Sequence, residues 1–211
     1  FKNVVGSSGT AVNSEGFKRL FRNADEVVLS FDQDYAGYGA ALSGIKQAAE
    51  SLRPGKTLSF FVTPGGKDPD EFFTPSTELY SADKKADLQK FSLNAQNEFK
   101  NAIDGRKPFY EVLLDLLAIN KKGKEGFDRN FGIEDVSDVS ERSAIVRSAV
   151  QTIALIKDKE YRLATSAAIE KILRYPNSSV STLVEEEVDL RAAKIKSTHV
   201  DIADSTDVSV K

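Results

Sequence analysis

The sequence has 211 residues, of which 40% are hydrophobic and 29% charged, with a formal net charge of −3 at pH 7. This composition is typical of a soluble globular protein that is long enough to bury a core. The absence of cysteine excludes disulfides and cysteine-ligated zinc within the sequence, and no apolar run approaches the roughly 20 residues of a membrane-spanning helix. The net charge gives no basic footprint for nucleic acid, although a local basic strip and an acidic metal site can coexist.

Strands and helices alternate along the first 75 residues. The expected elements are a helix capped by Asn13 or Ser14, a buried strand Glu26–Asp32, a helix Ala36–Leu52 and a second buried strand Thr57–Thr63. This alternation predicts a parallel, Rossmann-like sheet with crossover helices. Ligands of such sheets bind at the carboxyl ends of the strands.

Beyond residue 75 the pattern becomes helical. Apolar residues at threes and fours predict helices over Leu88–Ile103, Phe109–Ile119, Ser140–Ile156 and Glu160–Leu173, with Val180–Lys194 as a possible fifth. A glycine-rich charged connection, Gly123–Gly132, lies among them. The predicted fold class is α/β followed by all-α, with an α/β portion over 1–75, a helical bundle subdomain over 76–196 and a tail or linker over 197–211.

Asp32 and Asp34 are the first candidate site. In an extended segment, residues i and i+2 point to the same side, so both carboxylates can converge just past the strand. Hard oxygen ligands of this kind suit Mg²⁺ or Mn²⁺. Two carboxylates alone would hold such an ion weakly, so further acids are expected nearby. The structural alternative is that Asp34 caps the following helix while Asp32 makes a turn hydrogen bond.

Asp68 and Asp70 follow the second strand. Asp68-Pro69-Asp70-Glu71 is also a favourable helix start, with an acid at the cap, proline at the first position and acids in the first turn. Capping does not need all four aspartates, however, and a divalent cation would relieve the repulsion between acids at neighbouring strand ends.

Other polar residues are weaker candidates. The loop Gly6–Thr10 could bring backbone N–H groups to a phosphate, with Gly9 and Thr10 as the expected contacts, although no P-loop motif is present. Candidate phosphate or nucleic-acid contacts are Lys18, Arg19, Arg22 and Lys67. The alternative for these cations is a solvated helix face.

Taken together, three segments resemble the bacterial DnaG-type primase family. These are Asn3–Ala11 (NVVGSSGTA), Glu26–Ala41 (EVVLSFDQDYAGYGAA) and Gly66–Phe72 (GKDPDEF). Their order and spacing also agree with the family. Beyond about residue 73 the resemblance is looser and depends on Phe109-Tyr110-Glu111 and on the segment 156–162 (IKDKEYR).

The resemblance implies a TOPRIM metal-binding fold and the synthesis of short RNA primers on single-stranded DNA from ribonucleoside triphosphates during replication. It implies that Asp32 and Asp34 hold a catalytic Mg²⁺ or Mn²⁺, and that Asp68 and Asp70 support a second metal or the triphosphate. Lys67 and the helix with Lys18, Arg19 and Arg22 would contact phosphates. A replicative helicase would bind through a domain outside this sequence, and the expected location is the cytoplasm, at the nucleoid-associated replication fork.

Two departures from the family pattern bear on activity. The family takes a further glutamate ligand from an E-G-Y-x-D-like segment, expected just upstream of Phe1, so we expect this piece alone to be inactive or nearly so. Gln33 replaces the commoner glycine between the two aspartates.

The alternatives to a primase are another TOPRIM enzyme, such as a topoisomerase or nuclease, and a non-catalytic primase-like module that contacts DNA or the replisome.

Overall fold

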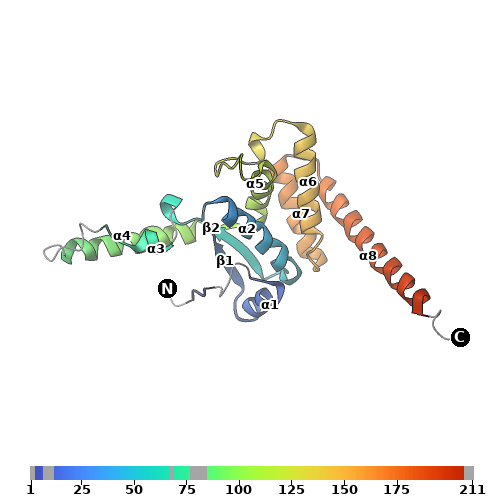
Figure 1. Ribbon diagram of the computed structural model, residues 1–211, viewed down its shortest axis with the longest axis horizontal. Helices are drawn as coiled ribbons and strands as arrows, with labels where there is room; N and C mark the ends of the chain where they lie inside the picture. The colour runs from blue at the N-terminus through green and yellow to red at the C-terminus, as the bar shows by residue number, and fades with distance from the viewer. Residues whose placement is uncertain (1–2, 7–11, 67–68, 77–84, 207–211) are drawn as a thin grey trace.

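The computed structural model describes residues 3–6, 12–66, 69–76 and 85–206. A small sheet and its flanking helices lie at the centre of the molecule (Figure 1). Helices α3 and α4 extend from this body to one side, and α8 extends to the other. No helix among the described residues is both long enough and apolar enough to cross a membrane.

The first portion contains the strands and helices that the sequence predicts. In chain order they are α1 (Ser14–Asn23), β1 (Glu26–Ser30), α2 (Tyr35–Ala48), the 3₁₀ turn η1 (Ala49–Ser51) and β2 (Thr57–Phe61). The two strands are parallel, as expected, with a register from Glu26 opposite Thr57 to Ser30 opposite Phe61. Asn13, not Ser14, caps α1, because its side-chain oxygen accepts a hydrogen bond from the Gly16 backbone N–H at 2.9 Å.

A third strand comes from beyond residue 75. Strand β3 (Lys107–Pro108) pairs antiparallel with β2, which gives the strand order β1-β2-β3 in the described sheet. The sheet is therefore mixed, although the alternation in the first 75 residues had predicted a parallel one. The proposed division at residue 75 separates two segments of sequence that share this sheet.

The remaining elements are mostly helical. They are η2 (Pro64–Gly66), α3 (Pro69–Phe73), α4 (Lys85–Asp104), α5 (Phe109–Lys122), η5 (Ile133–Asp135), α6 (Val139–Ile153), α7 (Lys159–Leu173) and α8 (Ser179–Thr206). Each predicted helix is present. Residues 197–206 continue α8, whereas their composition had indicated a tail or linker.

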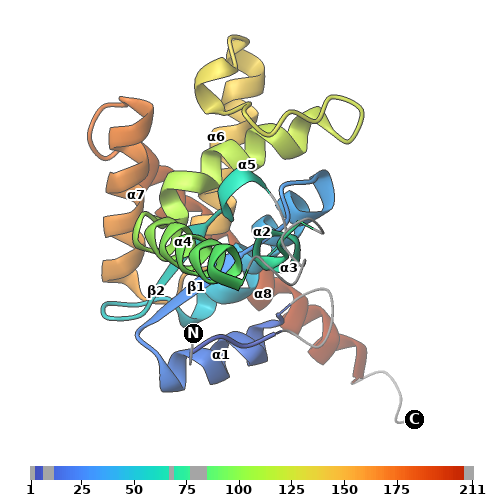
Figure 2. The same ribbon diagram turned by 90° about the vertical axis from the view of Figure 1, so that its left-hand side faces the viewer.

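One hydrophobic core joins the two portions. It includes Ile45 of α2 and Leu58 of β2 together with Leu113 of α5, Ile153 of α6 and Ile169 of α7, each at most 1% exposed. In the view along the long axis, α5 and α6 lie directly above the sheet and α2 (Figure 2). Because α5 packs on both α2 and β2, the helical portion covers one side of the sheet and stabilises it by apolar burial.

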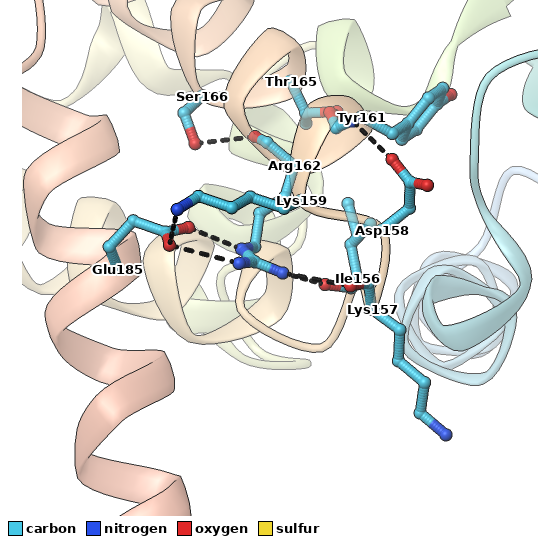
Figure 3. A network of polar contacts seen from close by, with 9 residues as sticks. All are labelled: Ile156, Lys157, Asp158, Lys159, Tyr161, Arg162, Thr165, Ser166 and Glu185. Carbon is cyan, nitrogen blue, oxygen red and sulfur yellow. Dashed lines mark hydrogen bonds and ion pairs between the residues drawn. The ribbon is translucent and has the colours of Figure 1, made fainter.

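A buried arginine fixes the helical portion internally (Figure 3). Arg162 of α7 is 6% exposed and donates through Nε to Glu185 Oε1 at 2.7 Å and through Nη1 to the Ile156 carbonyl at 2.7 Å. Asp158 caps the same helix by accepting a hydrogen bond from the Tyr161 backbone N–H at 2.9 Å. Within the IKDKEYR segment, Arg162 therefore joins α7 to α8 and Asp158 caps α7, so both residues have structural roles.

Candidate functional site

The carboxyl ends of β1 and β2 lie side by side at one edge of the sheet. Ser30 and Phe61, the last residues of the two strands, are register partners, so the segments that follow them start side by side. Asp32 and Asp34 follow β1, and the η2 turn Pro64–Gly66 follows β2. The polar segments after the two strands thus share one edge of the sheet, as the alternating pattern predicts.

The two aspartates of the first pair differ in their local contacts. Asp34 is the N-cap of α2, and its Oδ1 accepts a hydrogen bond from the Gly37 backbone N–H at 2.7 Å. The capping interpretation is therefore correct for Asp34. No described hydrogen bond or ion pair engages the side chain of Asp32, and both aspartates are exposed. The Asp32 carboxylate and the second Asp34 oxygen remain available as acceptors.

Gly37 fixes the backbone beneath this pair. A Cβ atom at position 37 would lie 2.0 Å from the Asp32 carbonyl oxygen and 2.9 Å from its carbonyl carbon. Helix α2 thus begins in direct contact with the main chain of Asp32, an approach that only glycine permits. The sequence shows a glycine here, but only the three-dimensional contact explains it.

The second acidic group is partly outside the described residues. Asp70 is exposed in the first turn of the short helix α3, which confirms a helix start at this point. Asp68 and Lys67 lie outside the described residues, as do Gly9 and Thr10 of the first loop. The four-aspartate arrangement therefore stays a prediction.

A divalent cation fits the chemistry of the described acids but is not fully ligated by them. Asp32 and Asp34 offer exposed carboxylate oxygens, the donor type that Mg²⁺ and Mn²⁺ prefer. Within the described residues, no group of three or more side chains of the metal-binding types is close enough to hold an ion. The described part of the edge thus supplies an incomplete ligand set.

A cavity of about 360 Å³ lies beside the acid pair, between α2, the strand ends, α5 and the segment 129–135. Its walls are mainly apolar, with Phe31, Phe60 and Leu116 among the lining residues. Asp115 of α5 also lines the cavity, and its Oδ1 accepts a hydrogen bond from the Ile133 backbone N–H at 2.9 Å. Burial raises the pKa of the Asp115 carboxyl, although the Ile133 hydrogen bond opposes the shift.

Sequence reasoning had not singled out Asp115. The one signal was an acid inside the apolar run of α5, between Leu114 and Leu116. An acid at such a position is rarely buried without a partner, which could have marked it as a contact residue.

The predicted basic residues of α1 lie near the other end of the strands. Arg19 and Arg22 are exposed and approach Glu15 at 3.6 and 3.5 Å. Lys18 and Arg22 line a second cavity of about 270 Å³, which Arg53 also lines. Since Arg22 and Arg53 precede β1 and β2, this basic cavity lies near the amino ends of the strands and not beside Asp32.

The comparisons with known proteins agree with this geometry. Residues 1–73 match the family described as Toprim-like. A DNA primase of Pseudomonas aeruginosa is 39% identical over 69 residues, which are 33% of this chain and 10% of that protein. A DNA primase of Staphylococcus epidermidis is 31% identical over 144 residues, which are 65% of this chain and 23% of that protein. The chain is thus similar in sequence to bacterial DNA primases over a third to two thirds of its length.

Solved primase structures share the fold of both portions. A crystal structure of a DNA primase domain from Pseudomonas aeruginosa has a TM-score of 0.55 at 21% identity and covers 84% of this chain and 46% of that one. The E. coli primase catalytic core has a TM-score of 0.55 at 20% identity, covering 82% and 45%. The Toprim-like sheet and the helical portion therefore occur together in these primase cores. The chain spans about a tenth to a quarter of the length of the primases cited above.

Proposed function

We propose that this chain is part of a DNA primase that synthesises short RNA primers on single-stranded DNA from ribonucleoside triphosphates. The observation that carries the proposal is the exposed pair Asp32 and Asp34 at the carboxyl end of β1, within a Toprim-like segment whose relatives are DNA primases. The alternatives of a topoisomerase or nuclease are not favoured, because the relatives found are primases.

Toprim domains generally bind a divalent cation such as Mg²⁺. We propose that Asp32 and Asp34 are the catalytic pair and bind Mg²⁺ or Mn²⁺, with Asp68 and Asp70 supporting a second ion or the triphosphate. When bound, such ions neutralise phosphate charge and lower the pKa of the attacking hydroxyl. The parallel register supports this assignment, since the segments that follow the two strands start from one edge of the sheet.

Phosphate contacts are proposed at both ends of the strands. Lys67 and the backbone of Gly9 and Thr10 would bind the triphosphate near the acids. Lys18, Arg19 and Arg22 would bind the backbone of the template, and the basic cavity near Arg53 supports a polyanion at that end.

The nucleic acid and the other partners are proposals as well. A similar structure, with a TM-score of 0.53 at 21% identity, is described as a DnaG primase catalytic domain bound to single-stranded DNA, which supports single-stranded DNA as the template. We also propose a replicative helicase partner, bound through another domain, and a place at the cytoplasmic replication fork.

Substitution of the acid pair in the full-length protein tests the proposal. Asp32→Asn and Asp34→Asn should each reduce primer yield on a single-stranded template by about 100-fold or more, because each removes a carboxylate charge that holds the cation, and the cation stabilises the transition state. Both side chains are exposed, so the free energy of unfolding should change by less than about 0.5 kcal/mol. Asparagine caps helices as well as aspartate does, so Asp34→Asn separates the charge from the capping contact.

Asp87→Asn, an exposed acid of α4, is the matched control and should leave primer yield unchanged. A folded Asp32→Asn variant that synthesises primers at the wild-type rate would show that the metal assignment is wrong. Calorimetric titration of Mn²⁺ into the full-length wild type and Asp32→Asn provides a second readout, in which only the wild type should bind tightly.

A further inference from the structure

A loop of the helical portion lies against the turn that carries the acid pair. This loop, residues 123–132, connects α5 to η5. The Phe127 ring makes edge contacts with Tyr35 and Tyr38 of α2, at centroid distances of 6.1 and 5.4 Å. The Tyr38 hydroxyl donates a hydrogen bond to the Arg129 carbonyl at 3.3 Å. These contacts dock the loop on the first turn of α2.

The side chain of Arg129 contacts the turn between Asp32 and Asp34. Its Nη1 donates to Gln33 Oε1 at 3.2 Å, and Gln33 is the residue between Asp32 and Asp34. The turn after β2 approaches from the other side, since a Cβ at Gly66 would lie 2.7 Å from Arg129 Nη1 and 2.9 Å from Gln33 Oε1. Gly66 also has a positive φ of 75°, which favours glycine. The guanidinium therefore sits where the segments after both strands meet.

The charges around Arg129 favour this position. The lining of the cavity beside it includes four acids, Asp32, Asp115, Glu134 and Asp135. Arg129 is the only basic side chain among the described lining residues. The direct contact of the guanidinium is its hydrogen bond to Gln33, and the negative charge of these lining residues attracts it at longer range.

We propose that Arg129 is a positioning residue for the Asp32–Asp34 turn. By binding Gln33, it fixes the main chain between the two acids and the spacing of this turn from the Gly66 turn. The helical portion, which supplies none of the predicted metal ligands, thereby contributes to the order of the site. The inference rests on the proposed function only for the assignment of metal binding to the acid pair.

Amide hydrogen exchange in the metal-free 211-residue chain tests the positioning directly. The reporter is the Gly37 amide, which donates to Asp34 and reports on the turn. Arg129→Ala and Gln33→Ala should each accelerate its exchange by roughly threefold to tenfold. The double variant should exchange no faster than the faster single variant, because both substitutions remove the same contact.

Two further variants distinguish the effect of the Arg129 side chain from the effect of the loop as a whole. Lys124→Ala removes an exposed cation of the same loop and should leave Gly37 exchange unchanged. Arg129→Lys keeps a cationic donor and should restore part of the protection. The Tyr38 hydrogen bond to the Arg129 carbonyl survives in every Arg129 variant, so the loop stays docked. Unchanged exchange in Arg129→Ala, additive effects in the double variant or an equal effect of Lys124→Ala would each overturn the proposal.

Mn²⁺ binding by the full-length protein separates positioning from charge. Coulomb's law alone predicts that removal of a positive charge near a cation site tightens binding. Positioning predicts the opposite, and we expect Arg129→Ala and Gln33→Ala each to weaken Mn²⁺ binding by about threefold. Tighter binding in Arg129→Ala would overturn the inference. If the wild type binds no Mn²⁺, the proposed function fails, while the exchange experiment still decides whether Arg129 positions the turn.

Discussion

Carboxylates in two regions of this molecule differ in burial and in hydrogen bonding. In the helical portion, Glu185 is paired with the buried Arg162, and Glu170 is 5% exposed and accepts hydrogen bonds from the backbone N–H groups of Ser178, Val180 and Ser181. At the carboxyl edge of the sheet, Asp32 and Asp34 are exposed, and no described side-chain contact engages Asp32.

The difference separates acids that hold the fold from acids that are available to a ligand. A buried carboxylate must be compensated by hydrogen bonds or an opposite charge, or its burial costs several kcal/mol. Burial alone would raise the pKa of Glu170, but its hydrogen bonds hold that pKa below the usual value. An exposed carboxylate needs no such partner, so its conformation must be fixed by the main chain around it.

The largest effect on stability should come from the buried pair. Arg162→Ala should lower the free energy of unfolding by about 3–5 kcal/mol, because it leaves the Ile156 carbonyl without its donor and Glu185 with only the longer contact to Lys159. Chemical denaturation monitored by circular dichroism measures this change. Arg147→Ala, an exposed arginine of α6, is the control and should change stability by less than about 0.5 kcal/mol. A loss below about 1 kcal/mol for Arg162→Ala would show that charge pairing stabilises the helical portion no more than it stabilises the carboxyl edge of the sheet.

The next effect concerns the main chain beneath the acid pair. Gly37→Ala should destabilise the protein by about 3 kcal/mol, because its Cβ would meet the Asp32 carbonyl oxygen at 2.0 Å. Gly39 lies on the same helix, and a Cβ there meets nothing within 4 Å. Gly39→Ala should therefore stabilise the protein by up to about 1 kcal/mol through helix propensity. Thermal unfolding measures the stability of Gly37→Ala and Gly39→Ala. Equal changes in the two variants would contradict the close contact at Gly37.

The smallest effect depends on pH and compares the two ends of β1. At the amino end, Arg106 donates to both carboxylate oxygens of Glu26, at 2.7 and 2.6 Å, and this pairing lowers the pKa of Glu26. A carboxylate with a lowered folded-state pKa stabilises the fold above its unfolded pKa, and the stabilisation is lost as pH falls through the folded value.

Wild type should therefore exceed Glu26→Gln in stability by about 1–2 kcal/mol at pH 7, and the difference should shrink steadily as the pH is lowered below about 4.5. Urea denaturation at a series of pH values measures it. Asp32→Asn, at the unpaired end, should change stability by less than about 0.5 kcal/mol at pH 7, and an equal loss in both variants would remove the distinction between the two ends.

Much of this fold is readable in the sequence because its signals are local. The apolar runs of β1 and β2, the cap at Asn13 and the apolar repeats of α5 to α7 each depend on neighbours within one element, so periodicity and capping rules find them. The same holds for the candidate site, since Asp32 and Asp34 lie at the carboxyl end of a predicted strand.

Other features depend on residues far apart in the sequence. The pairing of β3 with β2, the contact of Arg129 with Gln33 and the reach of Arg162 to Glu185 have no local signature. Sequence also could not show that Gly37 touches the Asp32 carbonyl, because the chain must first turn from β1 into α2. A pattern along the chain determines which elements form and where the acids lie in them. Which side chain finds a partner is decided only when packing brings distant segments within hydrogen-bonding distance.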